Sequence, residues 1–453
     1  MSADGSRVVG RLKGSPLVRP VLRPVRRHFA TGVRAALIAA VLAIPATLGP
    51  ERVDPAAAAI DPQLSIDKLG RIDNFFNSEI GGGKIPGAVV LVQRHGRPAY
   101  FRCFGVRDVD SGLPMSSDTI FRIFSMSKPI TAVTAMMLID QGKLGLHDPL
   151  SKYIPAFAQV KVGVETRGPD GVTRLATEPL RREITIEDLL RQSSGITYGF
   201  YGDSQVRKAY AAADLFREPL DNAIFAERLA KLPLAEQPGT VWDYGHSMDI
   251  VGRVIEVVTG KSLYQAEKEM LLDPLGMTDT AFYVADPEKY SRLARPMPSD
   301  STFVATMERD VRKPIAWEPG GSGMVSTPHD YARFAQMLLN GGMLDGRQYL
   351  SPEAFRTMTT NQIEPATGVK RGAFYFPGDG FGYGLGFGVR INRGDRNPPG
   401  AVGEIKWDGA GGTYFFADPK NDMFAMLMIQ SPSQRGRIIP ELKKLVYDAL
   451  ATK

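Results

Sequence analysis

The order in which strand-like and helix-like segments follow one another restricts the fold more than any other feature of the sequence. Runs rich in β-branched and aromatic residues lie near both ends of the chain, whereas the middle has helical periodicity. The predicted strands span residues 87–93, 99–104, 383–389, 405–407, 413–417 and 421–429. We therefore expect an α+β fold: an antiparallel sheet built from both chain ends and flanked by helices, with an inserted mainly helical lobe.

Helices are expected at 62–79, 130–139, 184–190, 211–232, 248–260, 330–340 and 439–450. Residues 158–183 are rich in Pro, Gly and charged side chains, which predicts a hairpin-like surface excursion. The Gly- and aromatic-rich residues 195–207 are typical either of a loop that lines a pocket or of an irregular surface loop. The single cysteine, Cys103, falls in a predicted strand, where we expect a core residue.

The first 59 residues differ from the rest of the chain in charge. They hold nine Lys or Arg and three acidic residues, which accounts for the whole formal net charge of +6. The remainder is balanced, which argues against nucleic-acid binding by the folded part. The basic stretch, the apolar run 35–48 and the small residues 56–59 predict a signal peptide over 1–59, with Arg26-Arg27 resembling a twin-arginine signal.

This leader predicts an exported protein that is periplasmic or secreted; a short N-terminal anchor or a disordered tail is the alternative. The run 35–48 is too short to cross a membrane, and no later run reaches the ~18 apolar residues that a spanning helix needs. We therefore expect one folded domain over 60–453 and no stable membrane span after leader removal. The sequence leaves the oligomeric state open.

A hydroxyl three residues before an amine, Ser125-x-x-Lys128, is the first candidate for chemistry. If the segment after Ser125 is helical, both side chains lie on one face. The apolar run 130–139 supports a buried helix, and Pro129 is tolerated in its first turn. A Ser beside a Lys is a known arrangement for nucleophilic catalysis. The alternative is a helix cap with a solvated Lys, which we prefer for the second such motif, Ser65-x-x-Lys68.

Two further stretches strengthen the first candidate. Tyr244 precedes a predicted helix, and a Tyr beside a Lys ammonium can have a lowered pKa and accept a proton. Taken alone, packing is the more common role for such a residue. Residues 407–415 (WDGAGGTYF) form a Gly-rich start to a strand, whose backbone N–H groups suit an oxyanion. Alone, this stretch is typical of an ordinary hairpin turn.

Together, the three motifs resemble the serine β-lactamase-like and penicillin-binding-protein-like hydrolase superfamily. The resemblance is to family VIII carboxylesterases and class C β-lactamase-related proteins, and it covers nearly all of residues 62–450. It also includes residues 189–196 (LLRQSSGI) and 320–327 (GGSGMVST), which carry no catalytic motif.

The resemblance implies the roles of the site residues. Ser125 is the acyl-forming nucleophile, Lys128 its proton-transfer partner, and Tyr244 the base for acylation and the proton donor to the leaving group. The backbone N–H groups of Ser125 and Ala410 form the oxyanion hole. Substrate contacts are expected from Trp407, Gly409 and His246. The implied reaction is two-step acyl transfer to water, on a small-molecule ester or amide, with no metal and no organic cofactor.

Two departures from the family pattern bear on the substrate. His246 stands where β-lactamases and DD-peptidases usually have Asn. Trp407 stands where they have a Lys that anchors a substrate carboxylate, and the neighbouring Lys406 is expected to point to the opposite face of the strand. Trp is typical of the esterase branch, although Asp408 replaces its usual Gly. A carboxylate at that position disfavours anionic substrates further.

Other hydrolase chemistry fits poorly. The sequence has no G-x-S-x-G and no H-E-x-x-H, and its five histidines lack metal-ligand spacing. The favoured hypothesis is an exported carboxylesterase for small to medium acyl esters. The alternatives are a β-lactamase or D-alanyl-D-alanine carboxypeptidase, and a catalytically inert binding protein with the same fold.

Overall fold

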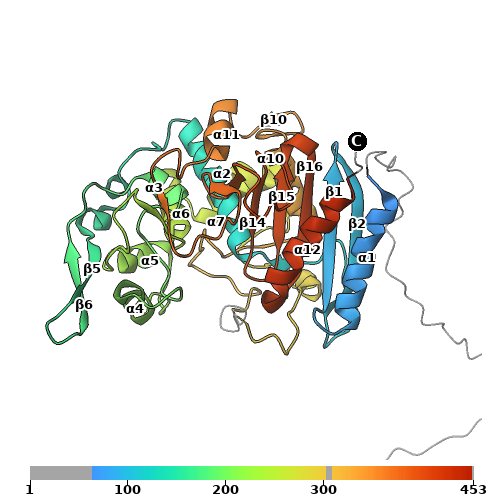
Figure 1. Ribbon diagram of the computed structural model, residues 1–453, viewed down its shortest axis with the longest axis horizontal. Helices are drawn as coiled ribbons and strands as arrows, with labels where there is room; N and C mark the ends of the chain where they lie inside the picture. Colours follow the sequence, from blue (N-terminus) through green and yellow to red (C-terminus); the bar gives the residue numbers. More distant parts are fainter. Residues whose placement is uncertain (1–63, 303–308, 451–453) are drawn as a thin grey trace, which may run out of the picture. The chain divides into compact units, whose positions relative to one another are not determined.

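An antiparallel sheet of eight strands runs through the computed structural model, which describes residues 64–302 and 309–450 (Figure 1). The strands are β1 Gly87–Arg94, β2 Arg97–Asp108, β3 Leu113–Pro114, β12 Phe381–Tyr383, β13 Gly388–Arg390, β14 Ile405–Asp408, β15 Tyr414–Asp418 and β16 Met423–Met428. Their order is β12-β13-β14-β15-β16-β1-β2-β3. The two ends of the chain meet where β1 pairs with β16, with Val89 opposite Met428. The predicted α+β fold is confirmed.

Both faces of this sheet are covered. Alternate residues of β16 enter two different hydrophobic cores: Ala425 and Leu427 face one side, and Met426 and Met428 face the other. Helices α1 (Ile66–Gly81) and α12 (Arg435–Asp448) cover the first side, and α10 (Pro328–Leu339) and α2 (Ser127–Asp140) lie on the second (Figure 1). Double coverage explains why the central strands are continuously apolar in sequence.

The segments between the two groups of strands form the predicted helical lobe. Its helices are α3 Ile186–Leu190, α4 Gln205–Ala212, α5 Asn222–Leu229, α6 Ser247–Thr259, α7 Leu263–Glu267 and α8 Asp273–Leu275, and α11 Pro352–Thr359 follows α10. Short two-stranded pairs join the lobe to the sheet domain: β4 Phe121–Arg122 with β8 Val325–Ser326, and β7 Val241–Trp242 with β11 Lys370–Arg371; β9 Met343–Leu344 pairs with β10 Arg347–Gln348. Within the described ranges, no helix has the length and apolarity needed to cross a bilayer.

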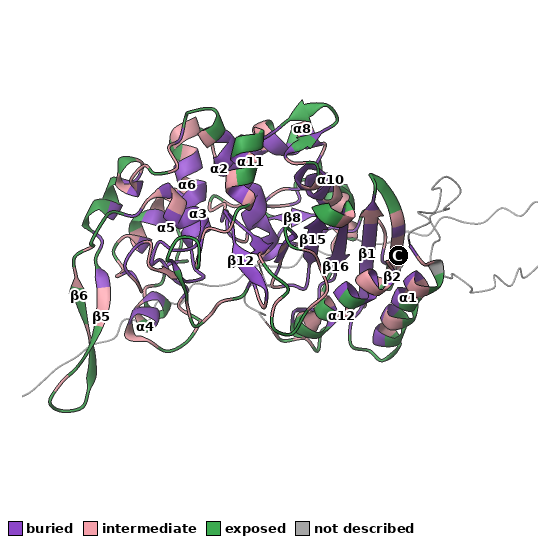
Figure 2. Cartoon of the chain, turned by 45° about the horizontal axis from the view of Figure 1, so that its top comes forward, coloured by how far each residue is buried: buried purple, intermediate pink, exposed green. Residues whose placement is uncertain are grey.

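Helix α2 lies between the sheet and the lobe, and it carries Lys128. All of its residues from Ser127 to Leu138 are buried, as its colour in Figure 2 shows. The helix is apolar on nearly every side because it packs against several elements rather than one. The predicted buried helix after Ser125 is therefore confirmed.

The predicted excursion at 158–183 is also confirmed. Strands β5 (Val162–Arg167) and β6 (Thr173–Glu178) form an antiparallel hairpin whose residues are mostly exposed (Figure 2). The predicted helix 62–79 is α1, with Leu69, Ile72 and Phe76 buried as expected; residues 62 and 63 lie outside the described ranges. The predicted leader, 1–59, also lies outside them.

The prediction of a single helix over 211–232 was wrong. The chain forms α4 and α5, separated by a connection with Asp214 in the left-handed region (φ 49°). Pro219 in this connection lacks the N–H that a continuous helix would need. Asp221 then caps a new helix, because its Oδ1 accepts a hydrogen bond from the Ile224 amide at 2.7 Å.

The prediction of a continuous strand over 383–389 was also wrong. The segment is the end of β12, a tight turn, and the start of β13, with the Gly384 amide bonded to the Phe387 carbonyl at 2.9 Å. Gly386 has φ 100°, and a side chain there would overlap Ala132 of α2. The close approach of this turn to α2 therefore requires glycine and breaks the strand.

Candidate active site

Ser125 and Lys128 lie together at the start of α2. Ser125 is the middle residue of a 3₁₀ turn, Phe124–Met126, that leads directly into the helix. The Lys128 ammonium nitrogen lies 3.2 Å from Ser125 Oγ, and the lysine side chain is fully buried. The predicted spacing on one face is thus confirmed, and a Lys at zero exposure is not the solvated neighbour of a cap.

The residue before Ser125 has an unusual backbone. Phe124 has φ 45°, a left-handed conformation that is costly for an aromatic residue, by about 1–3 kcal/mol. Its surroundings hold it in place: Thr413 Oγ1 donates to the Ile123 carbonyl at 3.3 Å, and the Arg122 amide donates to Gln430 Oε1 at 3.0 Å. The C-terminal strands therefore fix the turn that presents the serine.

Three oxygen atoms surround the Lys128 nitrogen. Besides Ser125 Oγ, they are the Gly321 carbonyl at 2.6 Å and the Tyr198 hydroxyl at 3.4 Å. A neutral amine has two N–H donors and one lone pair. The carbonyl can only accept, so the neutral form can donate to Gly321 and Tyr198 and accept the Ser125 proton. An ammonium would donate to all three oxygens, so the arrangement accommodates the amine both before and after it takes a proton.

Burial favours that neutral state. It lowers the pKa of Lys128 to about 8, against the opposing charges of Asp249 and Asp408. About a tenth of the amine is then neutral at pH 7, compared with about four in ten thousand at an ordinary lysine pKa. Lys128 is therefore the titratable group of the site that is poised to accept a proton near neutral pH.

Tyr244 is buried beside Lys128, on the loop between β7 and α6. The Lys128 nitrogen lies 4.6 Å from the centre of the Tyr244 ring, a cation–π contact with its face. Burial raises the pKa of this phenol, and the Ser125 hydroxyl and the Trp407 indole oppose the rise only in part. The lowering of the pKa that was expected from a neighbouring Lys128 does not offset the effect of burial. The structure holds Tyr244 as a neutral phenol.

Tyr198 is a site residue to which the sequence assigned no role. It comes from the aromatic loop 195–207, and its hydroxyl reaches Lys128. Its ring makes edge contacts with Tyr244 (centroids 5.5 Å apart) and His246 (4.4 Å) and stacks on Phe200 (4.8 Å). The loop therefore belongs to the site, as the pocket interpretation of these residues predicted.

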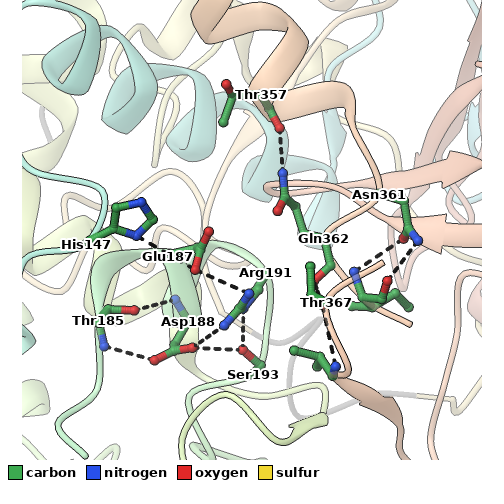
Figure 3. A network of polar contacts seen from close by, with 12 residues as sticks. His147, Thr185, Glu187, Asp188, Arg191, Ser193, Thr357, Asn361, Gln362 and Thr367 are labelled. Carbon is green, nitrogen blue, oxygen red and sulfur yellow. Dashed lines mark hydrogen bonds and ion pairs between the residues drawn. The ribbon is translucent and has the colours of Figure 1, made fainter. Parts of the chain in front are cut away.

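A polar network under α3 fixes the start of that loop (Figure 3). The buried Asp188 carboxylate accepts hydrogen bonds from the Thr185 amide (3.0 Å), Arg191 Nη2 (2.8 Å) and Ser193 Oγ (3.2 Å). Burial raises the pKa of Asp188, but these bonds and one from Arg182 outweigh it and leave the pKa lowered. A permanent carboxylate thus anchors the turn that leads to Tyr198.

His246 is connected to Lys128 indirectly, by contacts that run through Asp249 and the backbone of Gly321. Its Nδ1 lies 2.7 Å from Asp249 Oδ2, both side chains being buried, and Asp249 Oδ1 accepts from the Gly321 amide at 2.8 Å. The carbonyl of the same Gly321 holds Lys128. Asp249 and Gly321 thus support the lysine, although neither residue was predicted to have a role. Position 321 lies in the stretch 320–327, which the family resemblance had singled out.

The turn between β14 and β15 lies beside the serine segment. The Gly409 amide donates to the Thr413 carbonyl at 2.7 Å and the Gly412 amide to the Gly409 carbonyl at 2.9 Å, while the Ala410 amide is not used in either bond. A side chain at Gly409 would overlap the Ile123 carbonyl. Gly409 is therefore needed for backbone packing, and the predicted oxyanion role of the Ser125 and Ala410 amides stays a prediction.

Trp407 contributes an apolar wall to the site. Its ring is buried, 5.8 Å from that of Tyr244 and 5.4 Å from that of Tyr383, and its Nε1 has no full hydrogen bond within the described ranges. Lys406 lies on the other face of β14, with its nitrogen 4.2 Å from the centre of the Phe381 ring. The predicted alternation is confirmed, and an apolar ring occupies the place of the family's cation.

Metal-binding geometry is absent from residues 64–302 and 309–450, where no three His, Cys, Asp or Glu side chains could hold an ion together. His95 lies in the hairpin turn between β1 and β2. Cys103 lies on β2 and is partly buried, so the expected strand position is correct.

Comparisons with known proteins agree with this architecture. A family model described as Beta-lactamase matches residues 72–447. The chain belongs to the Beta-lactamase family. It is 37% identical over 359 residues to Protein Rv1367c of Mycobacterium tuberculosis, covering 77% of this chain and 86% of that protein. It is 29% identical over 418 residues to Esterase EstB of Burkholderia gladioli, covering 86% and 99%.

Among solved structures, EstCE1, described as a hydrolase with promiscuous acyltransferase activity, matches with a TM-score of 0.70 and 25% identity, over 84% of this chain and all of that one. The predicted superfamily and fold are thereby confirmed. As a Beta-lactamase family protein with these relatives, the chain is a serine hydrolase or acyltransferase. The catalytic roles of its individual residues stay predictions.

Proposed function

We propose that the protein is a serine carboxylesterase that cleaves small to medium acyl esters through an acyl-enzyme on Ser125. The observation that carries the proposal is the Lys128 nitrogen, fully buried and 3.2 Å from Ser125 Oγ. A buried amine with a pKa of about 8 can take the serine proton at neutral pH. We assign this base role to Lys128, because burial keeps Tyr244 protonated.

Acylation begins when Ser125 passes its proton to the neutral Lys128 amine and Oγ attacks the ester carbonyl carbon. A C–O bond forms, and the carbonyl oxygen becomes an oxyanion, for which the Ser125 and Ala410 amides are the proposed donors. The bond to the alcohol then breaks. The alkoxide takes the proton from the Lys128 ammonium, which lies beside Ser125 Oγ, leaving an acyl-Ser125 ester, a neutral amine and a free alcohol.

Deacylation repeats these steps with water in place of the serine hydroxyl. Water passes a proton to the same amine, attacks the acyl carbon and releases the acid, and Ser125 regains its proton. An alcohol in the position of the water would give acyl transfer by the same steps. The aromatic rings of Tyr198 and Tyr244 lie against the Lys128 nitrogen, and Trp407 packs on Tyr244, so these rings shield the amine from solvent and maintain its lowered pKa.

Esters are favoured over β-lactams by the residue at position 407. β-Lactams and cell-wall peptides present a carboxylate near the scissile bond, and an indole ring offers no charge to bind it. Neutral esters lose nothing by this replacement. The name of the relative EstB, an esterase, and the description of EstCE1, a hydrolase, point the same way.

Turnover of p-nitrophenyl acetate and butyrate by wild type and by Ser125→Ala tests the proposal. We expect rapid hydrolysis by wild type and no enzymatic rate for the variant. Nitrocefin hydrolysis or stable labelling of Ser125 by a fluorescent penicillin, without ester turnover, would instead support the β-lactamase or carboxypeptidase alternative. An inert binding protein would leave all of these substrates unchanged.

We also propose that the enzyme acts after export, directed by a signal peptide over residues 1–59. The basic residues, the apolar run and the small residues of the sequence support this. Cell fractionation and N-terminal sequencing of the full-length protein expressed in bacteria test it. A cytoplasmic protein with an intact N-terminus would contradict the proposal.

A further inference from the structure

An ion pair at the edge of the site carries an inference about which esters the enzyme prefers. Asp408 is the last residue of β14, between Trp407 and the turn beside Ser125, and Arg435 is the first residue of α12. Asp408 Oδ2 and Arg435 Nη1 lie 3.7 Å apart. The two side chains are 37% and 31% exposed, so solvent and substrate can reach both.

Both charges of this pair act on the catalytic groups. Burial is the main cause of the raised pKa of Tyr244, and in addition Asp408 raises it and Arg435 lowers it. Tyr201, on the aromatic loop, responds to the same two charges with the same signs. Asp408 also raises the pKa of Lys128. The geometry agrees: Gly409, the residue after Asp408, packs so closely on the Ile123 carbonyl that a side chain there would overlap it. The pair therefore lies beside the segment that carries Ser125, and its two charges oppose each other there.

The geometry of the pair is loose. A separation of 3.7 Å exceeds hydrogen-bond distance, and partial exposure weakens the attraction further. Neither partner is therefore committed to the other, as a buried bidentate pair would be. Arg435 is a cation that could receive a substrate anion, and Asp408 is the group with which that anion must compete.

We propose that the Asp408–Arg435 pair sets the charge selectivity of the site. Asp408 withholds the Arg435 guanidinium from anionic substrates, and together the two charges keep the edge of the site neutral. Asp408 is the residue at which this chain departs from the esterase pattern. It thus affects substrate charge through its partner Arg435 on α12 rather than as a free carboxylate. The inference rests on the proposed esterase function.

Three butyrate esters of similar shape test the proposal: those of 3-carbamoylphenol (neutral), 3-carboxyphenol (anionic) and 3-(trimethylammonio)phenol (cationic). The measured quantity is kcat/KM for each charged ester relative to the neutral one. Asp408→Asn should raise the relative value for the anionic ester by about three- to tenfold, and Arg435→Gln should shift preference by a similar factor toward the cationic ester. The double variant should return to the wild-type ratios.

High salt and a matched variant provide controls. Because the pair is exposed, 1 M NaCl should remove most of each shift. Lys444→Gln removes a positive charge from an exposed pair with Asp448 on the same helix and should leave all ratios within twofold. Each ratio is internal to one preparation, so partial loss of folded enzyme does not affect it.

Ratios that stay within twofold of wild type in both single variants would overturn the inference, as would shifts of the same sign. Hydrolysis of the neutral ester by wild type reports separately on the proposed function. If that ester is not hydrolysed, the esterase proposal fails; if it is hydrolysed but the ratios do not move, only the charge-selectivity proposal fails.

Discussion

Two Ser-x-x-Lys segments of this chain lie at the starts of two successive α-helices, on opposite sides of the sheet, and differ in structure. At α1, Ser65 has an extended backbone (φ −80°, ψ 114°), and its Oγ accepts a hydrogen bond from the Lys68 backbone amide at 3.4 Å. At α2, Ser125 already lies inside a 3₁₀ turn, and its Oγ contacts the Lys128 side-chain nitrogen. The first serine is a helix cap, and the second is placed to be a nucleophile.

The difference lies in backbone conformation and burial rather than in the motif. An extended serine before a helix turns its hydroxyl toward the amide three residues on. A serine within the turn shares a face with the side chain at i+3. Lys68 is partly exposed, whereas Lys128 is fully buried among aromatic rings. The surrounding fold therefore decides which chemistry the same four-residue pattern has.

Exchanging each serine for alanine is the strongest way to separate the two segments. Ser125→Ala should lower kcat/KM for p-nitrophenyl butyrate by at least about 10³-fold, because the acyl-forming oxygen is lost. Ser65→Ala should leave kcat/KM within twofold but lower the free energy of unfolding by about 1 kcal/mol, because α1 loses its cap. Urea unfolding measures the second effect. A Ser125→Ala enzyme with full activity would remove the contrast.

Replacing the two lysines sharpens the comparison. Lys128→Met removes the proposed base and should lower kcat/KM by about 10²–10⁴-fold, while the melting temperature stays the same or rises because a buried amine no longer needs desolvation. Lys68→Met should change kcat/KM less than twofold. Equal effects of the two variants on activity would show that burial next to the serine does not matter.

The pH dependence tests the electrostatics around Lys128. The active form is the neutral amine, so kcat/KM should rise with pH and reach half its maximum near pH 8. Asp249 raises the pKa of Lys128, so Asp249→Asn should move the midpoint to lower pH, and Asp408→Asn should do so by a smaller amount. A midpoint that moves upward in either variant would contradict this assignment.

The smallest predicted effect is on the pH dependence of stability, and it concerns one glutamate near α2 and one on α1. Glu267 is fully buried, and its Oε1 lies 2.9 Å from Thr131 Oγ1, one turn beyond Lys128 on α2. Burial raises its pKa well above the ordinary value of 4.5, so the folded state keeps a proton that the unfolded state loses. Stability contributed by this group therefore falls as pH rises above about 4.5. Glu267→Gln should be more stable than wild type at pH 8 and equal to it at pH 4.

Glu79 of α1 gives the control of opposite sign. A hydrogen bond from Arg437 lowers the pKa of Glu79 despite its burial, so its contribution to stability is present above the unfolded pKa and lost as pH falls. Glu79→Gln should therefore be less stable than wild type at pH 8. Urea midpoints of both variants at pH 4 and pH 8 measure the two effects. Shifts of the same sign at pH 8 would contradict the account.

Local patterns in the sequence predicted much of this structure. Runs rich in β-branched and aromatic residues predicted most strands of the sheet, and the spacing of Ser125 and Lys128 predicted the first two site residues, because both depend on near neighbours in sequence. The split of 383–389 depended instead on contact between Gly386 and Ala132 on α2. No pattern within the strand itself contains that information.

The residues that support Lys128 were out of reach for the same reason. Gly321, whose carbonyl holds the amine, lies 193 positions away along the chain, and Tyr198 lies 70 positions away. Asp249 is three residues from His246 at the start of α6, and this i, i+3 spacing could have predicted their contact from the sequence alone. The face-on contact of Tyr244 with Lys128, and the burial that raises the pKa of the phenol, required coordinates.

The most direct test of the central claim is the site and rate of labelling by a fluorophosphonate probe, measured by peptide mapping as a function of pH. The account predicts that Ser125 is labelled and Ser65 is not, that the rate rises to half its maximum near pH 8, and that Lys128→Met abolishes it. Labelling of another residue, or a Ser125 rate that Lys128→Met leaves unchanged, would contradict the account.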